Sequence, residues 1–187
     1  QAVMACPAHR QTNLEIARQS LVLLRNEGIL PLAPAPRKLA VIGPNADDPL
    51  SQLGDWSLGS GQCNLQNSHP RQSTTTILDG LKAMAPAGWT VTHAPGCAIE
   101  HEGQDGLPAA ARLAAESDLV VLVLGDSLPF IGETHSTATL ELQGGQKALV
   151  EAVFATGKPV IGVLVNSKPL VLPAKLLGSA ALLELFN

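Results

Sequence analysis

Residues 119–124 are the most constraining stretch of this chain, because six consecutive aliphatic side chains lead directly into a polar loop that contains glycines. A short, valine-rich run of this kind is typical of a strand covered on both faces, as in a parallel sheet. In open sheets of alternating strands and helices, ligands bind at the carboxyl ends of the strands. We therefore expect any functional residues to lie in the loop that begins at Gly125.

Apolar runs alternate with segments of helical periodicity along most of the chain. Helical spacing of apolar side chains predicts helices at residues 12–20, 75–85, 107–116 and 145–155. Short apolar runs predict strands at residues 38–43, 89–93, 119–124, 160–165, 170–172 and 181–186, and residues 21–24 favour a buried strand or a helix end. This order predicts an α/β fold, a mostly parallel sheet of about six strands with helices on both faces.

Charge and cysteine usage narrow the classes of function. The formal net charge of -4 provides no basic field for nucleic acid, and no apolar run approaches the roughly 20 residues that span a bilayer. Cys6, Cys63 and Cys97 form no CxxC pair, so neither a zinc site nor a redox motif is indicated. Buried free thiols are favoured, and a bridge between Cys63 and Cys97 is the alternative.

Two familiar motifs are present only in part. The predicted strand at 38–43 ends in a glycine, but no second or third glycine and no helix follow directly, so the dinucleotide-binding fingerprint is absent. Residues 125–128 read GDSL, as in a class of serine esterases, but a serine nucleophile needs an imidazole and usually a carboxylate to orient it. No Asp follows Asp126 and the only later histidine is His135, so Ser127 lacks the usual downstream pair.

A series of longer motifs is more specific than either of these. They are ARQSLVLLRNEGILPL (17–32), LAVIGPNAD (39–47), GDWS (54–57), TTTILDGLK (74–82), APGC (94–97), SDLVVLVLGD (117–126), GET (132–134) and GQKALVEAVFATGKPVIGVLVNSKPL (145–170). In number and order they resemble the C-terminal α/β-sandwich domain of glycoside hydrolase family 3, the β-glucosidase and β-xylosidase family. The resemblance assigns residues 1–16 to a linker and the start of the first helix. It assigns residues 17–187 to the C-terminal domain of a larger enzyme, and this domain is expected to be truncated at its C-terminal end.

The resemblance implies retaining hydrolysis of a terminal β-glycoside, by two carboxyl groups roughly 5 to 5.5 Å apart across the anomeric carbon. In this family the nucleophile is an Asp on a preceding TIM-barrel domain, which this sequence does not contain. The general acid/base of similar members is a Glu in the loop after the central strand, and Glu133 matches it. Next to an ionised Asp and away from water, such a carboxyl holds its proton more tightly, as a general acid requires.

Three further residues are candidates for substrate binding. Trp56 lies in the long irregular stretch 44–73, where its ring can stack on a sugar or anchor the loop. Asp126 and His135 lie near Glu133 in sequence and can bind substrate or orient the acid, although solvated loop residues are the simpler interpretation. The polar residues after Glu133 and the loop at 63–69 depart from the family pattern, which affects the expected substrate preference more than the reaction.

The sequence therefore predicts the acid/base-bearing domain of an exo-acting, β-glucosidase-like hydrolase that needs no metal or cofactor. Its expected partners are an oligosaccharide or other β-glycoside and the barrel domain of the same enzyme, with no nucleic acid or membrane. By itself this chain is expected to be inactive. The alternative is a non-catalytic domain that covers the sugar of an enzyme whose acid/base lies on the barrel, and the third hypothesis is the GDSL-type esterase.

Overall fold

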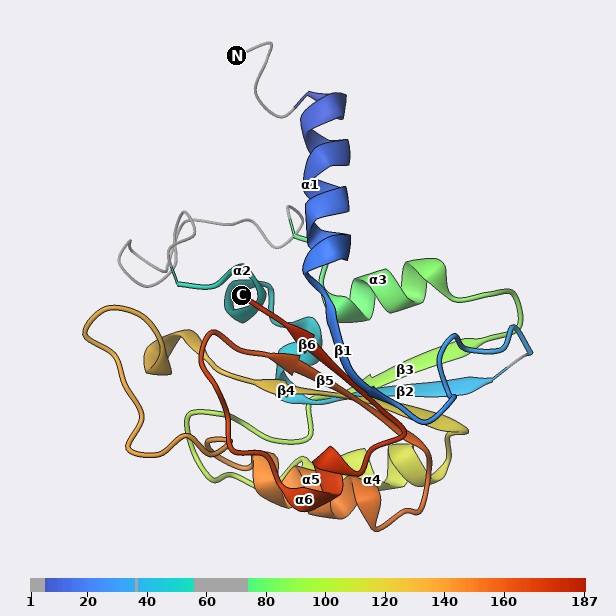
Figure 1. The fold of residues 1–187 in the computed structure, drawn as a ribbon. Helices are drawn as coiled ribbons and strands as arrows, with labels where there is room; N and C mark the ends of the chain where they lie inside the picture. Colours follow the sequence, from blue (N-terminus) through green and yellow to red (C-terminus); the bar gives the residue numbers. More distant parts are fainter. Residues whose placement is uncertain (1–5, 36, 56–73) are drawn as a thin grey trace.

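The fold is an α/β domain built on one sheet, and the computed structural model describes residues 6–35, 37–55 and 74–187 (Figure 1). Its elements in chain order are α1 (Pro7–Ser20), β1 (Val22–Asn26), β2 (Lys38–Ile42), η1 (Pro44–Asp47), α2 (Pro49–Leu53), α3 (Ile77–Met84), β3 (Thr90–Ala94), α4 (Leu107–Ala115), β4 (Leu119–Gly125), η3 (Leu128–Phe130), α5 (Gln146–Phe154), β5 (Val160–Val165), α6 (Ala174–Leu177) and β6 (Ala181–Leu185).

The six strands lie in the order β1-β6-β5-β4-β2-β3. All neighbouring pairs are parallel except β1 with β6, which is antiparallel. The predicted fold class is therefore confirmed. The predicted strand at 160–165 is found with the same bounds, and the central strand is one residue longer than the six-residue run, ending at Gly125.

Every residue of β4 is buried, because helical layers cover both faces of the sheet. Alternate side chains along a strand point to opposite faces. Val120, Leu122 and Leu124 pack in the cluster that includes α4, α5 and α6, whereas Val121 and Val123 pack in the cluster that includes α3 and η1. Figure 1 shows these two layers, with α4, α5 and α6 below the sheet and α3 above it.

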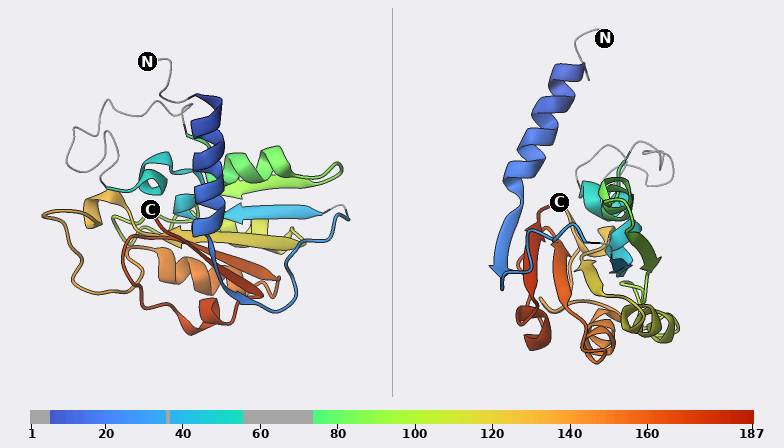
Figure 2. Two further views of the ribbon diagram at one scale, coloured as in Figure 1. Left: turned by 45° about the horizontal axis from the view of Figure 1, so that its top comes forward. Right: turned by 90° about the vertical axis from the view of Figure 1, so that its right-hand side faces the viewer.

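The first helix and strand differ from the sequence prediction. Helix α1 begins at Pro7, within the segment predicted to be a linker, and none of its residues is buried. It extends away from the domain and continues into β1, as Figure 2 shows. Residues 21–24 were expected to be buried, yet β1 is an edge strand in which every residue is exposed. A run of apolar residues predicts a strand but does not indicate which layer, if any, covers it.

Two other segments also differ. Residues 170–172 form no strand, and Val171 makes only an isolated bridge to Glu141. The start of the stretch at 44–73 is more regular than expected, because η1 and α2 fold there. Asp48 caps α2 by accepting from the backbone N–H groups of Leu50 and Ser51, which satisfies donors that a helix start leaves open.

The strand order defines one switch point. From β2 the chain moves outward to β3, then returns to place β4 on the opposite side of β2. The loops that leave the carboxyl ends of β2 and β4 therefore diverge, and such a divergence is where open α/β sheets bind ligands. The loop with Glu133 is the one that leaves β4.

Candidate active site

Gly125, the last residue of β4, fixes where the loop with Glu133 begins. Its backbone N–H donates to Oε1 of Gln146, and its carbonyl accepts from Nε2 of the same side chain, each at 2.9 Å. Its φ of 158° brings the backbone so close to β5 that an added Cβ would lie 1.9 Å from the carbonyl oxygen of Val165. Only glycine fits here, and Gln146 satisfies both of its polar groups.

Asp126 follows and is buried, with 2% of its surface exposed. Its Oδ1 pairs with Nζ of Lys168 at 2.8 Å, and its carbonyl accepts from Nδ2 of Asn45, also at 2.8 Å. Asn45 lies in η1, immediately after β2, so this hydrogen bond joins the two loops of the switch point. A buried carboxylate needs such a partner, because an unpaired charge in the interior is costly.

The next turn is held by further polar contacts. The buried hydroxyl of Ser127 donates to Oε1 of Glu100. Lys168 also donates to the carbonyl of Phe130 at 3.3 Å, and Nδ1 of His135 lies 3.1 Å from the carbonyl of Pro129. The stretch between Asp126 and His135 is therefore folded back on itself and connected to the rest of the sheet at several points.

Glu133 lies in a tight turn, in which the N–H of His135 donates to the carbonyl of Gly132 at 3.1 Å. Gly132 has a φ of 93°, and an added Cβ would lie 1.9 Å from Oδ2 of Asp55, which follows α2. Thr134 has a φ of 70°, which is uncommon for a β-branched residue. Backbone strain of this kind is found preferentially at functional sites.

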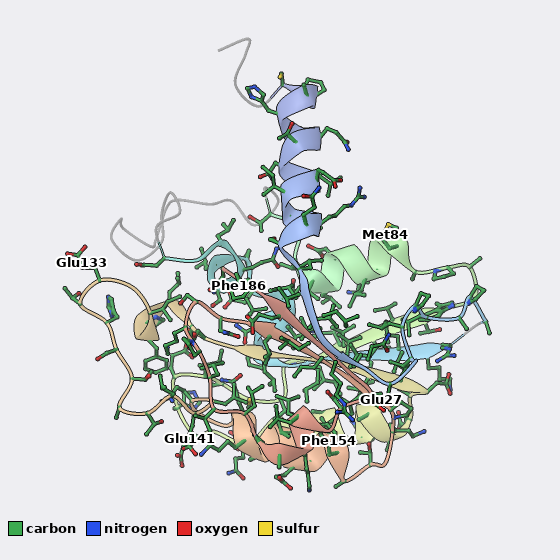
Figure 3. All side chains as sticks on the ribbon, in the orientation of Figure 1. Glu27, Met84, Glu133, Glu141, Phe154 and Phe186 are labelled. Carbon is green, nitrogen blue, oxygen red and sulfur yellow. The ribbon has the colours of Figure 1, made fainter. Side chains whose placement is uncertain are left out.

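The side chain of Glu133 is exposed and does not pack against its own sheet. Figure 3 shows it at the outer end of the loop, pointing away from the body of the domain. His135 is exposed beside it, whereas Asp126 lies inside the domain. Trp56 is outside the described residues. The structure thus separates the predicted candidates into an outer group at the turn and one buried residue at the base.

Other titratable groups lie away from the turn. Burial raises the pKa of Glu184 in β6 to about 7, an effect that a hydrogen bond with Asn166 opposes and the nearby Asp126 charge reinforces. Burial lowers the pKa of His93 in β3. Cys97 is a free thiol whose pKa burial raises to about 12, so it is a poor nucleophile. The predicted alternative of a bridge to Cys63 involves a residue outside the described part.

Within the described ranges, no cluster of three or more His, Cys, Asp or Glu side chains is arranged to bind a metal ion. None of the helices in these ranges has the length and hydropathy needed to cross a membrane.

The sheet and the hydrogen-bonded polar loops at its switch point define an α/β domain with an exposed carboxylate, Glu133, at the edge where such sheets generally bind ligands. Comparison of the sequence with protein families identifies the family to which this domain belongs. Residues 21–186 match the profile of the glycosyl hydrolase family 3 C-terminal domain, and the chain belongs to this family. The resemblance found in the motifs is therefore confirmed.

Individual relatives support this assignment. A β-xylosidase from Formosa agariphila is 42% identical over 164 residues, which are 87% of this chain and 22% of that protein. A periplasmic β-glucosidase from Salmonella typhimurium is 31% identical, over 94% of this chain and 24% of that protein. Among solved structures, a β-glucosidase involved in saponin metabolism from intestinal bacteria has a TM-score of 0.89 and 37% identity, covering 100% of this chain and 30% of that one.

A second solved structure, a Listeria innocua β-glucosidase in complex with isofagomine, has a TM-score of 0.76 and 29% identity. It matches 98% of this chain but 24% of its own length. The chain thus corresponds to one domain of much larger glycosidases.

Three residues of the site were not singled out from sequence. Asn45 and Asp55 fall inside two of the matched motifs, LAVIGPNAD and GDWS, which was an available signal. Gln146 is the first residue of α5 and falls inside the matched motif at 145–170, but its type alone does not indicate the contact with Gly125. Lys168 lies in the last of the matched motifs, and its contacts with Asp126 and Phe130 stabilise the base of the loop.

Proposed function

We propose that this domain supplies the general acid/base of a retaining, exo-acting β-glycosidase, and that Glu133 is that residue. The observation that carries the proposal is the position of Glu133. It is exposed, lies in a strained turn beyond the carboxyl end of the central strand, and is directed away from its own sheet. A proton donor for a substrate bound by another domain needs this kind of presentation.

In the proposed mechanism Glu133 acts in both steps. It first donates a proton to the glycosidic oxygen while a carboxylate on a second domain attacks the anomeric carbon and forms a glycosyl-enzyme intermediate. Glu133 then accepts a proton from the water that hydrolyses this intermediate. The names of the relatives, β-xylosidase and β-glucosidase, support a terminal β-linked glucose or xylose as substrate.

The other predicted substrate-binding residues have separate roles in this proposal. His135 adjoins the acid on the exposed side of the turn and is proposed to contact the leaving group or orient Glu133. Asp126 is proposed to orient the loop from inside, since its carboxylate is buried and paired with Lys168. Trp56 stays a predicted stacking residue for the sugar. No step of the proposed reaction requires a metal or cofactor.

The second domain is proposed to be a barrel that carries the nucleophile and docks near α1 and β1. Large apolar side chains are exposed on these two elements, with Ile16 at 62% and Leu23 at 52%. A groove of about 510 Å³ between α1 and the end of β6 is lined by Leu14, Leu21 and Phe186, among others. Exposed apolar side chains that gather on one surface are typical of an interface.

The test compares Glu133→Ala with the unmodified enzyme that contains both domains, on two aryl β-glycosides. The substrate with the poor leaving group needs protonation, so its kcat/KM should fall by about 100-fold or more, whereas the activated substrate should lose much less in the glycosylation step. Added azide should restore turnover of the activated substrate, because it replaces the base-assisted water. An equal loss on both substrates, with no azide rescue, would reject the assignment.

A non-catalytic covering role is the alternative, and it predicts that Glu133→Ala changes KM for all substrates alike. The esterase hypothesis is less supported, because the hydroxyl of Ser127 donates to the carboxylate of Glu100 and the residue is buried, with 5% of its surface exposed. A fluorophosphonate probe distinguishes the two, since it labels an activated serine only.

A further inference from the structure

We infer that Lys168 is a positioning residue for the proposed acid/base, because it fastens the two ends of the segment that leads to Glu133. This inference rests on the function proposed above. Lys168 lies in the loop after β5, 35 positions after Glu133 in the sequence. The inference is that it helps to orient the proposed proton donor.

Two hydrogen bonds from one ammonium group carry the inference. Nζ of Lys168 lies 2.8 Å from Oδ1 of Asp126 and 3.3 Å from the carbonyl oxygen of Phe130. Asp126 begins the segment and Phe130 ends η3, three residues before Glu133. The lysine therefore bridges the start and the end of a single short turn and limits the directions in which the chain beyond it can leave.

The surroundings of Lys168 distinguish it from the other paired lysines. Its side chain is 23% exposed and its partner Asp126 is 2% exposed, so the pair is largely shielded from water. Lys147 and Lys175 pair with Glu141 and Glu151 on the surface, where each lysine is 48% exposed. Exposed pairs of that kind contribute little, whereas breaking a buried pair is strongly destabilising.

The backbone near the pair is already fixed, so Lys168 acts on the outer part of the loop. Gln146 holds Gly125 and Asn45 holds the carbonyl of Asp126, independently of the lysine. In the part of the chain that the structure describes, the carbonyl of Phe130 accepts a hydrogen bond from Lys168 alone, while its N–H donates to the carbonyl of Ser127 at 2.9 Å. Beyond Phe130 the chain is held by buried Ile131 and by the packing of Gly132 against Asp55. Loss of Lys168 should therefore leave the start of the loop in place and shift the turn that carries Glu133 without freeing it.

The experiment uses the two-domain enzyme with Lys168→Met, Lys168→Arg and the double variant Lys168→Met/Asp126→Asn. The double variant removes both charges, so that a folded protein is obtained even if the single variant leaves an unpaired carboxylate and unfolds. Lys175→Met serves as the matched control, since it also breaks a lysine–carboxylate pair, but one that lies on the surface, with Glu151. Each variant is assayed on the poor and the activated leaving group.

We expect Lys168→Met, or the double variant, to lose about 10- to 100-fold in kcat/KM on the poor leaving group and less than about 3-fold on the activated one, as small misplacements of a catalytic group can cost 100-fold. Lys168→Arg should recover most of the loss, and Lys175→Met should match the unmodified enzyme. In a Glu133→Ala background the same change should add no further selective loss, because the group it positions is absent.

Unchanged ratios between the two substrates, or an equal loss on both, would overturn the inference, since a purely structural role moves both substrates together. An additional selective loss in the Glu133→Ala background would overturn it too. The proposed function is judged separately, by Glu133→Ala alone. If that variant shows no leaving-group dependence the acid/base assignment fails, whatever Lys168 does.

Discussion

Gln146 forms two hydrogen bonds with the backbone of Gly125, accepting from its N–H and donating to its carbonyl, each over 2.9 Å. Both residues are buried, and the pair joins the first turn of α5 to the end of the central strand. The side chain thus replaces the strand partner that Gly125 would need as its chain turns into the loop, because buried backbone groups must be paired.

The first prediction concerns this pair. Gln146→Leu keeps the volume but leaves two buried backbone groups without partners, so the free energy of unfolding should fall by about 2 to 4 kcal/mol. Denaturant titration of the purified protein measures this change. Gln104→Leu, at an exposed turn residue, is the control and should stay within about 0.5 kcal/mol of the original protein. Equal effects in both variants would mean that the pair is not a stabilising contact.

The second prediction concerns Gly132. Its φ of 93° and its contact with Asp55 leave no room for a Cβ, so Gly132→Ala should displace the turn and cost about 1 to 3 kcal/mol. In the two-domain enzyme it should also reduce kcat/KM on poor leaving groups. Gly80→Ala is the matched control: Gly80 lies inside α3 with nothing within 4 Å of an added Cβ, and the change should stabilise the protein by about 0.4 to 1 kcal/mol. A Gly132→Ala variant as stable as the control would contradict the prediction.

The third prediction is a pH dependence of stability that originates at Glu184. Burial raises its pKa from 4.5 to about 7, so between these values the folded protein binds more protons than the unfolded chain. The contribution of Glu184 to stability is therefore fully present below pH 4.5 and is lost as the pH rises to 7. Glu184→Gln removes this dependence, and the stability difference between pH 4.5 and pH 8 should shrink by about 1 to 3 kcal/mol. Parallel pH profiles for the two proteins, measured by denaturant titration, would argue against it.

The fourth prediction tests where the proposed barrel domain docks. Leu23→Glu places a charge on an exposed apolar strand, so it should leave the stability of this domain within about 0.5 kcal/mol and yet weaken its association with the barrel. Limited proteolysis between the domains and kcat/KM of the two-domain enzyme report that association. Leu177→Glu is the control, because Leu177 is also exposed, at 51%, but lies on α6, away from the proposed interface at α1 and β1. Equal behaviour of the two variants would place the interface elsewhere.

The covered parts of the sheet could be predicted well from the sequence. The strand at 160–165 was found with the same bounds, because a run of five aliphatic residues and Gly162 between Pro159 and Asn166 fits a strand buried on both faces. The edge strand β1 has a similar apolar run but is exposed. Its environment depends on elements that lie outside its own segment, and local periodicity carries no information about them.

The candidate site was predicted as a region, and its internal contacts were not. The principle that ligands bind at the carboxyl ends of parallel strands pointed to the loop after β4, and the family motifs pointed to Glu133, whose role stays a prediction. The pairing of Asp126 with Lys168 joins residues 42 positions apart in sequence. Such a contact follows from the register between β4 and β5, which the sequence of either strand alone does not fix.

The turn that carries Glu133 is anchored at its base, while residues 133–136 are exposed on its outer side. Insertions and substitutions in such an outer segment can change the surface around Glu133 without moving the strands, since changes at exposed loop tips are well tolerated. The same sheet and loop base can thus be kept while the exposed segment around the proposed proton donor varies.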